Sequence, residues 1–520
     1  MSVAIPEFLN IADEFIARPA REHPDRIGIL GEPARFTYRE VEAATNRAAN
    51  AFKSWGCKPG ERILIVLPDS LDFIAAFFGA AKIGAIAVPV NSMARAEDYA
   101  YYLADSGAHF AVVHHSVIAE SVLKEFPPSL AIVAVAGGLP VDMAGVKVVS
   151  WEESCGAAPA TCESHPARAA DPAFFLYTSG SGGTPKAAIH RHEDMLHTSR
   201  GFAQGVLGLS SDDITYSVSK FFFAYGLGNG MYFPFSVGAS TVLDPGKPKP
   251  ERTAEILRNH RPTVLFSVPT FFAALLREAE HGLELDCSSL RMAVSAGETL
   301  PAEIFERFKR KFGVEIIDGI GSTEMLHMFL SCRPGNARPA SCGTAVPGYE
   351  AKIVDDEGRE VAENKIGNLW VRGGSAFSGY WNKSELTSRT RRGDWVVTGD
   401  KFTRDADSFY HYCGRADDMM KVAGMWVSPG EVENALLAHP LIAEAAVVAS
   451  ENEIGLVRPA AYVVLKNGAE IRAELGEEIR EWLKKRLSNF KCPSEIHFVE
   501  NLPKTATGKI QRFRLRAATR

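Results

Sequence analysis

Strand-like and helix-like segments alternate along most of this chain, and the alternation restricts the folds that it can adopt. Apolar runs at residues 62–67, 85–90, 110–113 and 131–135 are strand-like, and the first two flank an amphipathic helical pattern at residues 71–83. Such an order is typical of a largely parallel sheet that is covered by helices. A chain of 520 residues is too long for one hydrophobic core, so several subdomains are expected.

Two smaller patterns refine this prediction. Thr37 and Glu40 have the spacing of a capping box at the start of a helix that Gly56 can end. Residues 152–172 are rich in Ala, Pro and Ser, and they are predicted to form a loop.

The alternation continues through the middle third and then changes. Strand-like runs at 263–268, 291–295 and 314–317 accompany a helical pattern at 271–279. From about residue 340, short alternating runs between Gly, Pro and Asp predict an antiparallel β region.

The segment Gly414–Asp418 looks like a boundary, because mixed helix and strand patterns follow it. We therefore predict an α/β fold with two domains. Residues 1–416 form a large multi-subdomain N-terminal domain with parallel-type sheets and a β-barrel-like subdomain. Residues 417–520 form a small, mobile α+β C-terminal domain.

Composition excludes several classes of protein. The net charge of −6 does not favour nucleic-acid binding, and no apolar run is long enough for a membrane span. The N-terminus lacks the basic and apolar regions of a secretory signal. The eight cysteines are scattered without a Cys-x-x-Cys pair, which favours a reducing cytoplasm over a zinc site or disulfide scaffold.

The most informative short segment is Thr178-Ser179-Gly180-Ser181-Gly182-Gly183-Thr184-Pro185-Lys186, which directly follows an apolar run at 174–177. Glycine backbone N–H groups, hydroxyls and an ammonium are the donors that a phosphate requires. It is not a Walker A loop, because Pro185 precedes Lys186 and Ala187 follows it. The alternative, a flexible surface turn, remains open on this segment alone.

Four other segments have the residues of a nucleotide site rather than of a scaffold. They are Ser295–Glu298, Asp318–Glu324, Trp395–Asp400 and the basic stretch Pro503–Lys509. Each alone is more typical of a turn, but all of them occur in one chain.

With Gly414–Asp418 and the glycine-rich segment, these segments occur in the order found in the acyl-adenylate-forming (AMP-binding) superfamily, which the chain resembles over nearly its whole length. Residues 222–229, 319–327 and 503–512 look like the benzoate-CoA ligase branch. The resemblance implies ATP-dependent activation of an aromatic carboxylate to acyl-AMP, followed by transfer to coenzyme A with release of AMP and pyrophosphate.

The resemblance also implies which residues bind ATP. One group would hold its β- and γ-phosphates: Thr178, Ser179, Gly180, Ser181, Gly182, Gly183, Thr184 and Lys186. A second group would line the adenine site: Ser295, Ala296, Gly297, Glu298, Asp318, Gly319 and Ile320. Asp400 and Arg415 would bind the ribose hydroxyls.

The catalytic roles implied in the same way concern the α-phosphate. Thr323 would contact it, Glu324 would hold Mg²⁺, and Lys509 would bridge it to the carboxylate. Asp417 would be the hinge about which the C-terminal domain rotates. That rotation would withdraw Lys509 and bring the surface around Lys421 and Gly424 to the site for thioester formation.

For the acyl pocket, the candidates are Ala224, Tyr225 and His327, with Ile320 as a wall. Small residues beside Tyr225 would leave room for a flat ring. The alternative is that the aromatic residues at 221–225 belong to the core and that His327 is a packed histidine.

Three departures from the family pattern leave other functions open. Gly182 replaces a hydroxyl residue, Ala187 replaces a glycine, and Gly430 stands where Phe is frequent. The alternatives are a medium-chain or branched acyl-CoA synthetase, an adenylating enzyme that passes the acyl group elsewhere, and a nucleotide-binding sensor without turnover. A peptide-synthetase module is disfavoured, because only eleven residues follow Lys509. The expected partners are therefore a small carboxylic acid, ATP and CoA, and a homodimer is one assembly that the sequence permits.

Overall fold

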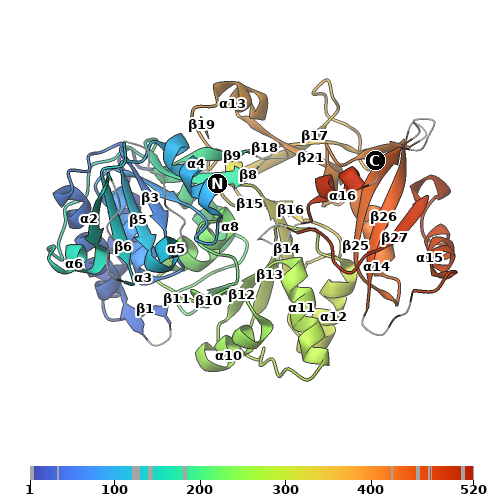
Figure 1. Ribbon diagram of the computed structural model, residues 1–520, viewed down its shortest axis with the longest axis horizontal. Helices are drawn as coiled ribbons and strands as arrows, with labels where there is room; N and C mark the ends of the chain where they lie inside the picture. The colour runs from blue at the N-terminus through green and yellow to red at the C-terminus, as the bar shows by residue number, and fades with distance from the viewer. Residues whose placement is uncertain are drawn as a thin grey trace.

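The computed structural model describes residues 5–31, 34–119, 129–138, 145–179, 184–422, 425–451, 457–466, 469, 471–504 and 510–518. Within these ranges, five sheets and the helices around them form the molecule. In Figure 1 an eight-stranded sheet lies at one end, a three-stranded sheet at the other, and strands of a nine-stranded sheet between them.

The eight-stranded sheet has the strand order β19-β9-β8-β4-β3-β5-β6-β7. Its strands are β3 (Arg62–Val66), β4 (Ile86–Pro89), β5 (Phe110–His114), β6 (Ile132–Ala136), β7 (Lys147–Ser150), β8 (Pro172–Ser179), β9 (Pro185–Arg191) and β19 (Gly379–Tyr380). The pairs from β8 to β7 are parallel, whereas β9 is antiparallel to both β8 and β19. The parallel sheet predicted for the first third is thus confirmed.

Helices of the same region accompany this sheet. They are the π-helical turn η1 (Asp13–Ala17), α1 (Arg18–Glu22), α2 (Tyr38–Ser54), α3 (Leu71–Lys82), α4 (Ala96–Ser106), α5 (His115–Ala119) and α6 (Trp151–Gly156). Ten of the twelve residues of α3 are buried, because it packs on α2 as well as on the sheet. The loop predicted for 152–172 is wrong at its start, since Ser150 caps α6 by accepting a hydrogen bond from the Glu153 N–H.

The nine-stranded sheet has the order β16-β15-β14-β13-β12-β10-β11-β1-β2. Its strands are β1 (Ile27–Leu30), β2 (Arg35–Thr37), β10 (Ile214–Ser217), β11 (Ser240–Val242), β12 (Val264–Ser267), β13 (Met292–Ser295), β14 (Ile316–Gly321), β15 (Met328–Ser331) and β16 (Thr344–Ala345). The strands from β1 to β14 along this order are parallel. Their carboxyl ends therefore meet at one edge, where α/β sheets bind ligands.

Short helical segments connect these strands. They are α7 (His192–Thr198), η2 (Ser199–Gln204), α8 (Ala224–Leu227), η3 (Gly228–Tyr232), α9 (Phe233–Ser236), α10 (Pro250–His260), α11 (Pro269–Glu280), α12 (Ala302–Phe312) and the 3₁₀ turn η4 (Thr323–Met325).

The antiparallel region predicted after residue 340 is a five-stranded sheet. It consists of β17 (Tyr349–Val354), β18 (Gly367–Gly373), β20 (Arg391–Arg392), β21 (Trp395–Arg404) and β22 (Tyr410–Arg415), and α13 (Ser384–Thr390) precedes β20. We expected a barrel-like subdomain here. The order β17-β18-β21-β20, with β22 also paired to β21, is open within the residues that the structure describes.

The C-terminal part has a hydrophobic cluster of its own, formed by residues between Met420 and Phe498. Its elements are β23 (Met420–Val422), β24 (Met425–Val427), α14 (Pro429–Leu437), β25 (Ile442–Glu451), β26 (Val457–Leu465), α15 (Leu475–Lys484), η5 (Asn489–Lys491), β27 (Glu495–Phe498) and α16 (Arg512–Ala518). This is the small α+β arrangement that the sequence predicted.

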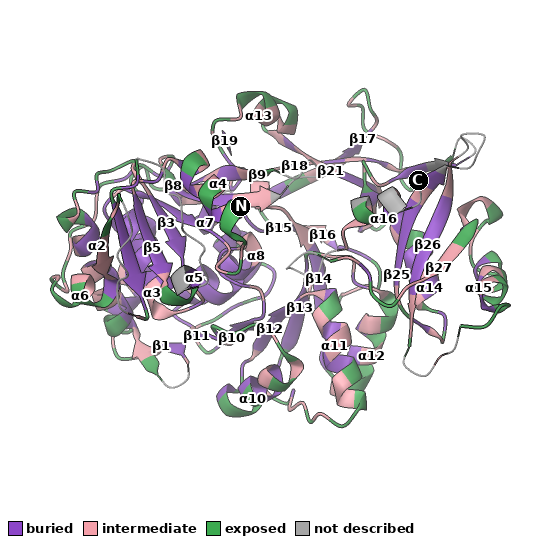
Figure 2. Cartoon of the chain, in the orientation of Figure 1, coloured by how far each residue is buried: buried purple, intermediate pink, exposed green. Residues whose placement is uncertain are grey.

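Burial follows the sheets. Figure 2 shows the strands mostly buried and the outer faces of the helices exposed. All eight cysteines fall within the described ranges and are free thiols. Among the helices described, none is both long and apolar enough to cross a membrane.

The predicted capping box at the start of α2 is present, and it gives a test of the fold. Thr37 accepts a hydrogen bond from the Glu40 N–H, and Glu40 accepts one from the Thr37 N–H. We expect Thr37→Ala to destabilise the protein by about 1 kcal/mol and to lower Tm by about 1 °C, because the first turn of α2 loses its cap. Thr37→Ser is the control in thermal unfolding and should keep most of the stability. Equal losses in the two variants would contradict this role.

Candidate nucleotide and acyl site

The glycine-rich segment joins two antiparallel strands. Thr178 of β8 pairs with Lys186 of β9, and Ser179 pairs with Pro185. The predicted phosphate ligands Gly180, Ser181, Gly182 and Gly183 lie outside the described residues, as does the side chain of Ser179. Thr178 is half-buried, Thr184 is exposed and Lys186 is half-buried beyond the turn.

Lys186 meets the predicted metal ligand through a tyrosine that the sequence did not single out. Its Nζ donates to the Tyr380 hydroxyl at 2.8 Å and lies 3.8 Å from Glu324 Oε1. The Tyr380 hydroxyl donates to Glu324 Oε1 at 2.5 Å. Burial lowers the pKa of Lys186, and the Glu324 carboxylate opposes this shift. The structure thus gathers β9, β19 and η4 at one charged cluster.

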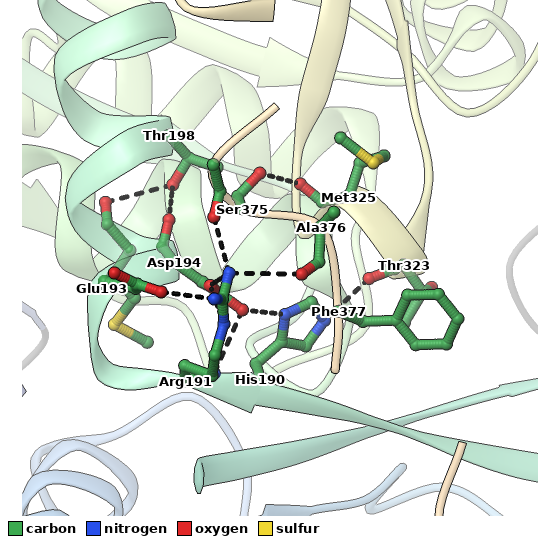
Figure 3. Close-up of polar contacts among 12 residues, drawn as sticks. His190, Arg191, Glu193, Asp194, Thr198, Thr323, Met325, Ser375, Ala376 and Phe377 are labelled. Carbon is green, nitrogen blue, oxygen red and sulfur yellow. Dashed lines mark hydrogen bonds and ion pairs between the residues drawn. The ribbon is translucent and has the colours of Figure 1, made fainter. Parts of the chain in front are cut away.

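The turn η4 carries two of the predicted catalytic residues, Thr323 and Glu324, and donors from outside the turn hold each of its three carbonyls. The Thr323 carbonyl lies 2.8 Å from Nε2 of His190 on β9. The Glu324 carbonyl accepts from the Phe377 N–H at 2.8 Å, and the Met325 carbonyl accepts from Ser375 Oγ at 2.7 Å. Figure 3 shows two of these contacts, from His190 to Thr323 and from Ser375 to Met325. The main chain of Thr323 and Glu324 is therefore fixed before any ligand binds.

Close packing explains why positions 319 and 321 of the same segment are glycine. A Cβ on Gly319 would lie 2.6 Å from the Leu330 carbonyl oxygen, and one on Gly321 would lie 2.5 Å from the His327 carbonyl oxygen. Both positions face the returning strand β15, whose backbone cannot yield to a side chain. Besides the role in the adenine site predicted for Gly319, the two glycines allow β14 and the start of β15 to approach closely.

Three buried polar side chains lie side by side at the carboxyl ends of β12, β13 and β14. Ser267 pairs with Ser295, and Ser295 pairs with Asp318. Ser267 Oγ, Ser295 Oγ and Asp318 Oδ1 make no hydrogen bond of normal geometry to the described residues. Burial raises the pKa of Asp318 to about 8, and Ser295 offsets part of the rise. Unsatisfied groups in such a row are costly unless a ligand pairs with them, and this is where adenine was predicted.

The rest of the predicted adenine segment follows this row. Ala296 is buried and Gly297 is exposed, with a φ of 88°. Glu298 turns away to α11, where its Oε2 accepts from the Thr270 N–H at 3.2 Å and from the Thr270 hydroxyl at 2.5 Å. In this structure Glu298 therefore caps a helix.

The two predicted ribose ligands contact each other. Asp400 and Arg415 are partners in the β21–β22 register, and Arg415 Nη1 donates to Asp400 Oδ1 at 3.0 Å. Asp400 is buried, and its carboxylate helps to raise the pKa of Arg415 against the effect of burial. The pair can present a fixed carboxylate oxygen to a diol.

The predicted acyl-pocket residues lie together around His327. The rings of Tyr225 and His327 have centroids 5.5 Å apart, and Phe233 and Phe202 also pack on the imidazole. His327 is 2% exposed, Nε2 lies 3.1 Å from Asn229 Oδ1, and burial lowers its pKa to about 3. The imidazole is therefore neutral at physiological pH.

Other members of that set are less enclosed. Ala224 starts α8, Ile320 is half-buried on β14, and the Tyr225 hydroxyl lies 3.2 Å from the Ser267 carbonyl oxygen and 3.1 Å from that of Val294. The alternative of core aromatics holds for Phe221 and Phe222, which are both buried. The amide nitrogen of Asn229 and Nδ1 of His327 are buried without a hydrogen bond to the described residues.

The predicted hinge residue Asp417 is exposed in the turn between β22 and β23. Arg516 of α16 donates to its carbonyl at 3.3 Å and pairs with the carboxylate of Asp418. Lys421 lies in β23, but its side chain is outside the described part, and so are Gly424 and Lys509.

Three residues depart from the family pattern, and the structure describes the surroundings of two of them. Ala187 is buried in β9, and Gly430 lies in the first turn of α14, where a Cβ would meet only Ser428 Oγ, at 3.7 Å. Gly182 is not among the described residues.

Two family models match this chain, one in its N-terminal part and one in its C-terminal part. Residues 16–381 match the AMP-binding enzyme model, and residues 431–509 match the AMP-binding enzyme C-terminal domain. The chain belongs to the AMP-binding enzyme family.

Within that family the chain falls in the benzoate-CoA ligase-like branch. It is 40% identical over 526 aligned residues to benzoate–CoA ligase of Thauera aromatica, covering 99% of this chain and 97% of that one. It is 37% identical to 4-hydroxybenzoate–CoA/benzoate–CoA ligase of Rhodopseudomonas palustris, over 98% of this chain and 94% of that one.

Two solved structures of ligases superpose on nearly the whole of this chain. The anthranilate CoA ligase AuaEII, in complex with anthranoyl-AMP, superposes with a TM-score of 0.92 at 37% identity, over 99% of this chain and 98% of that one. The benzoate CoA ligase of Burkholderia xenovorans LB400 gives a TM-score of 0.88 at 38% identity, over 98% of this chain and 100% of that one.

Sequence reasoning missed Tyr380 and His190, which contact the predicted catalytic residues Glu324 and Thr323, and Ser375, which holds the Met325 carbonyl of the same turn. Tyr380 lies in Phe377–Trp381, 56 residues after Glu324, with no local pattern to connect them. His190 and Asp194 lie on either side of the junction of strand β9 and helix α7, so no helical or strand period connects them.

The row of unsatisfied polar atoms predicts a pH effect on stability. The pKa of Asp318 is raised from 3.8 to about 8, so the folded state binds the proton more tightly than the unfolded state. Its contribution to stability is complete below pH 3.8 and is lost as pH rises toward 8. Relative to wild type, Asp318→Asn should therefore gain up to about 1.4 kcal/mol of stability per pH unit between pH 6 and 8.

Thermal unfolding of the ligand-free protein from pH 6 to 9 measures this difference. Asp286→Asn is the matched control, because hydrogen bonds from Ser288 lower the pKa of Asp286 and its titration is complete below pH 6. Parallel Tm profiles for wild type and Asp318→Asn would contradict the raised pKa.

Proposed function

We propose that this protein activates an aromatic carboxylate of the benzoate type with ATP, giving acyl-AMP and pyrophosphate, and then transfers the acyl group to CoA with release of AMP. The observation that carries the proposal is full-length similarity to enzymes named for such acids. These relatives are ligases named for benzoate, 3- and 4-hydroxybenzoate and anthranilate, and each is 37–40% identical to this chain. ATP and CoA are then substrates.

The acyl site supports a flat ring. His327 is neutral and lies against Tyr225, Phe202 and Phe233, so the enclosure is aromatic and uncharged. An alkyl chain gains no stacking from such walls, whereas a benzoate ring does. This favours an aryl acid over the medium-chain or branched alternative.

The phosphate side of the site fits Mg²⁺ with few protein ligands. No group of three or more His, Cys, Asp or Glu side chains among the described residues could hold a metal. Mg²⁺ is commonly bound by one carboxylate together with substrate phosphates and water. Glu324 is a half-buried carboxylate that now accepts from Tyr380 and faces Lys186. When bound, Mg²⁺ would neutralise phosphate charge.

The residues of this chain would act as follows. Lys186, desolvated beside Glu324, would bind the β- and γ-phosphates as the charge on pyrophosphate develops. Thr323, on its fixed main chain, would donate to the α-phosphate, and Asp400 would hold the ribose. Lys509 would complete the site by contacting both the carboxylate and the α-phosphate.

For the second step, we propose rotation of residues 417–520 against residues 1–416 about Asp417. The separate hydrophobic cluster of the C-terminal part supports this division, and so does the gap between the two family models, at residues 382–430. The surface around Lys421 and Gly424 would then replace Lys509. A cytoplasmic location and a homodimer remain predictions.

A second candidate is an acid–AMP ligase that passes the acyl group elsewhere. It is favoured by 34% identity to p-hydroxybenzoic acid–AMP ligase FadD22 of Mycobacterium tuberculosis, over 95% of this chain and 68% of that one.

The choice is tested by a panel of benzoate, hydroxybenzoates, anthranilate, cinnamate and short alkanoates. We expect pyrophosphate exchange with an aryl acid, and AMP release that needs CoA for turnover. Exchange with alkanoates alone would contradict the aryl proposal. Carboxylate-dependent pyrophosphate exchange with acyl-AMP as the product, and no acyl-CoA formed when CoA is added, would favour the second candidate. Absence of carboxylate-dependent exchange would favour a nucleotide sensor.

Lys509 is tested by separating the two half-reactions. We expect Lys509→Ala to lose about 10²–10³-fold or more in adenylate formation, because positive charge is lost where negative charge develops. Thioester formation from supplied acyl-AMP should be retained. Lys504→Ala is the control, since Lys504 pairs with Glu444 at 2.7 Å within the C-terminal part. Equal loss of both half-reactions in Lys509→Ala would remove the assigned role.

A further inference from the structure

We propose that His190 carries a proton on both ring nitrogens and, as an imidazolium paired with Asp194, positions Thr323 and Glu324. Its catalytic consequence rests on the proposed function, whereas its protonation does not. The two side chains are four residues apart at the junction of β9 and α7, and both are 0% exposed. Neither was part of the predicted site.

The geometry requires a donor at Nε2. This nitrogen lies 2.8 Å from the carbonyl oxygen of Thr323. A carbonyl oxygen has no proton to donate, so Nε2 must carry one. Figure 3 shows the imidazole between this carbonyl and Asp194.

The other ring nitrogen also faces an acceptor. Nδ1 of His190 lies 2.9 Å from Asp194 Oδ2. The same oxygen accepts from the Arg191 N–H at 3.0 Å, and Asp194 Oδ1 lies 2.8 Å from Arg191 Nη2. A carboxyl group held by a guanidinium in this way is ionised, so Nδ1 must donate to it. His190 then has two ring protons and a positive charge.

Charge balance in the cluster supports the same assignment. Arg191 pairs with two carboxylates, those of Glu193 and Asp194. With neutral His190 the cluster would have a net negative charge where Asp194 is fully buried, and the imidazolium brings the sum to zero. The ring also stacks on Phe174, with centroids 5.2 Å apart and planes at 20°, which favours a cation.

The consequence for the site follows from the position of the contact. A charge-assisted hydrogen bond holds the Thr323 carbonyl, and the next carbonyl, that of Glu324, accepts from Phe377. The peptide before the Glu324 Cα is thus held by His190 and the peptide after it by Phe377. His190 acts through this peptide as a positioning residue.

His192, two residues further on, provides an internal control. It is 1% exposed, its Nδ1 accepts from the Ile11 N–H at 3.2 Å, and burial lowers its pKa to about 4. It should therefore have one ring proton in the same sample.

The first test is ¹⁵N NMR of histidine-labelled, ligand-free protein at pH 7.5, with His190 assigned by the signal lost in His190→Gln. We expect two protonated ring nitrogens for His190 and one for His192. One protonated nitrogen at His190 would overturn the proposal, and this readout is independent of activity. In Asp194→Asn, His190 should become neutral, because an amide can donate to Nδ1, whereas two retained protons there would also count against the pairing.

The second test is kinetic. His190→Leu removes the donor and should lower kcat for adenylate formation by about 10-fold or more, with the KM for the acid within about twofold. His190→Gln keeps an N–H group within reach of the Thr323 carbonyl and should restore most of kcat. Equal loss of kcat in both variants would overturn the positioning role, and the NMR result on wild type decides the protonation even if the leucine variant does not fold.

Discussion

The geometry of the site depends on the three carbonyls of η4, which three separate donors hold. His190, Phe377 and Ser375 contact the carbonyls of Thr323, Glu324 and Met325, at 2.8, 2.8 and 2.7 Å. A 3₁₀ turn of three residues has almost no stability of its own. Its conformation is therefore imposed by β9 and by the segment before β19, and these are the elements that also bring Lys186 and Tyr380 to Glu324.

This arrangement makes the two large sheets parts of one site. Strand β14 of the nine-stranded sheet leads into η4, and β9 and β19 belong to the eight-stranded sheet. Ligands of the β- and γ-phosphates would come from the eight-stranded sheet, and contacts to the α-phosphate, adenine and acyl group from the nine-stranded sheet and the segments that follow its strands. A relative shift of about 1 Å between them would misplace Thr323 against the α-phosphate, and such errors are costly in catalysis. The buried pair of His190 and Asp194 lies at this junction, where rigidity matters more than its net contribution to stability.

Much of the fold could be predicted from local patterns, because buried strands and amphipathic helices have distinct periods. The predicted runs at 62–67 and 263–268 and the capping box at Thr37 depend only on neighbouring residues, and the structure confirms them as β3, β12 and the start of α2. Tyr380 and Ser375 could not be found in this way, because their partners are about fifty residues away across a sheet. The close approach of backbone to Gly319 and Gly321 could not be predicted either, since the sequence does not say which segment packs on a glycine.

Buried polar groups are paired in one part of the site and unpaired in another, and this difference separates positioning from ligand binding. The polar groups of the His190 cluster are paired, and they fix the main chain. Those at the carboxyl ends of β12, β13 and β14 lack hydrogen bonds of normal geometry within the described residues. A paired group stabilises the ligand-free fold, whereas an unpaired one raises its free energy until a ligand supplies the partner. Asp318 belongs to the unpaired groups, and burial of its carboxyl group raises its pKa. This carboxyl group lies where an adenine ring would bring its donors. Rigid positioning and unsatisfied binding capacity thus come together where β14 leads into η4, so that binding energy need not be used to form the site.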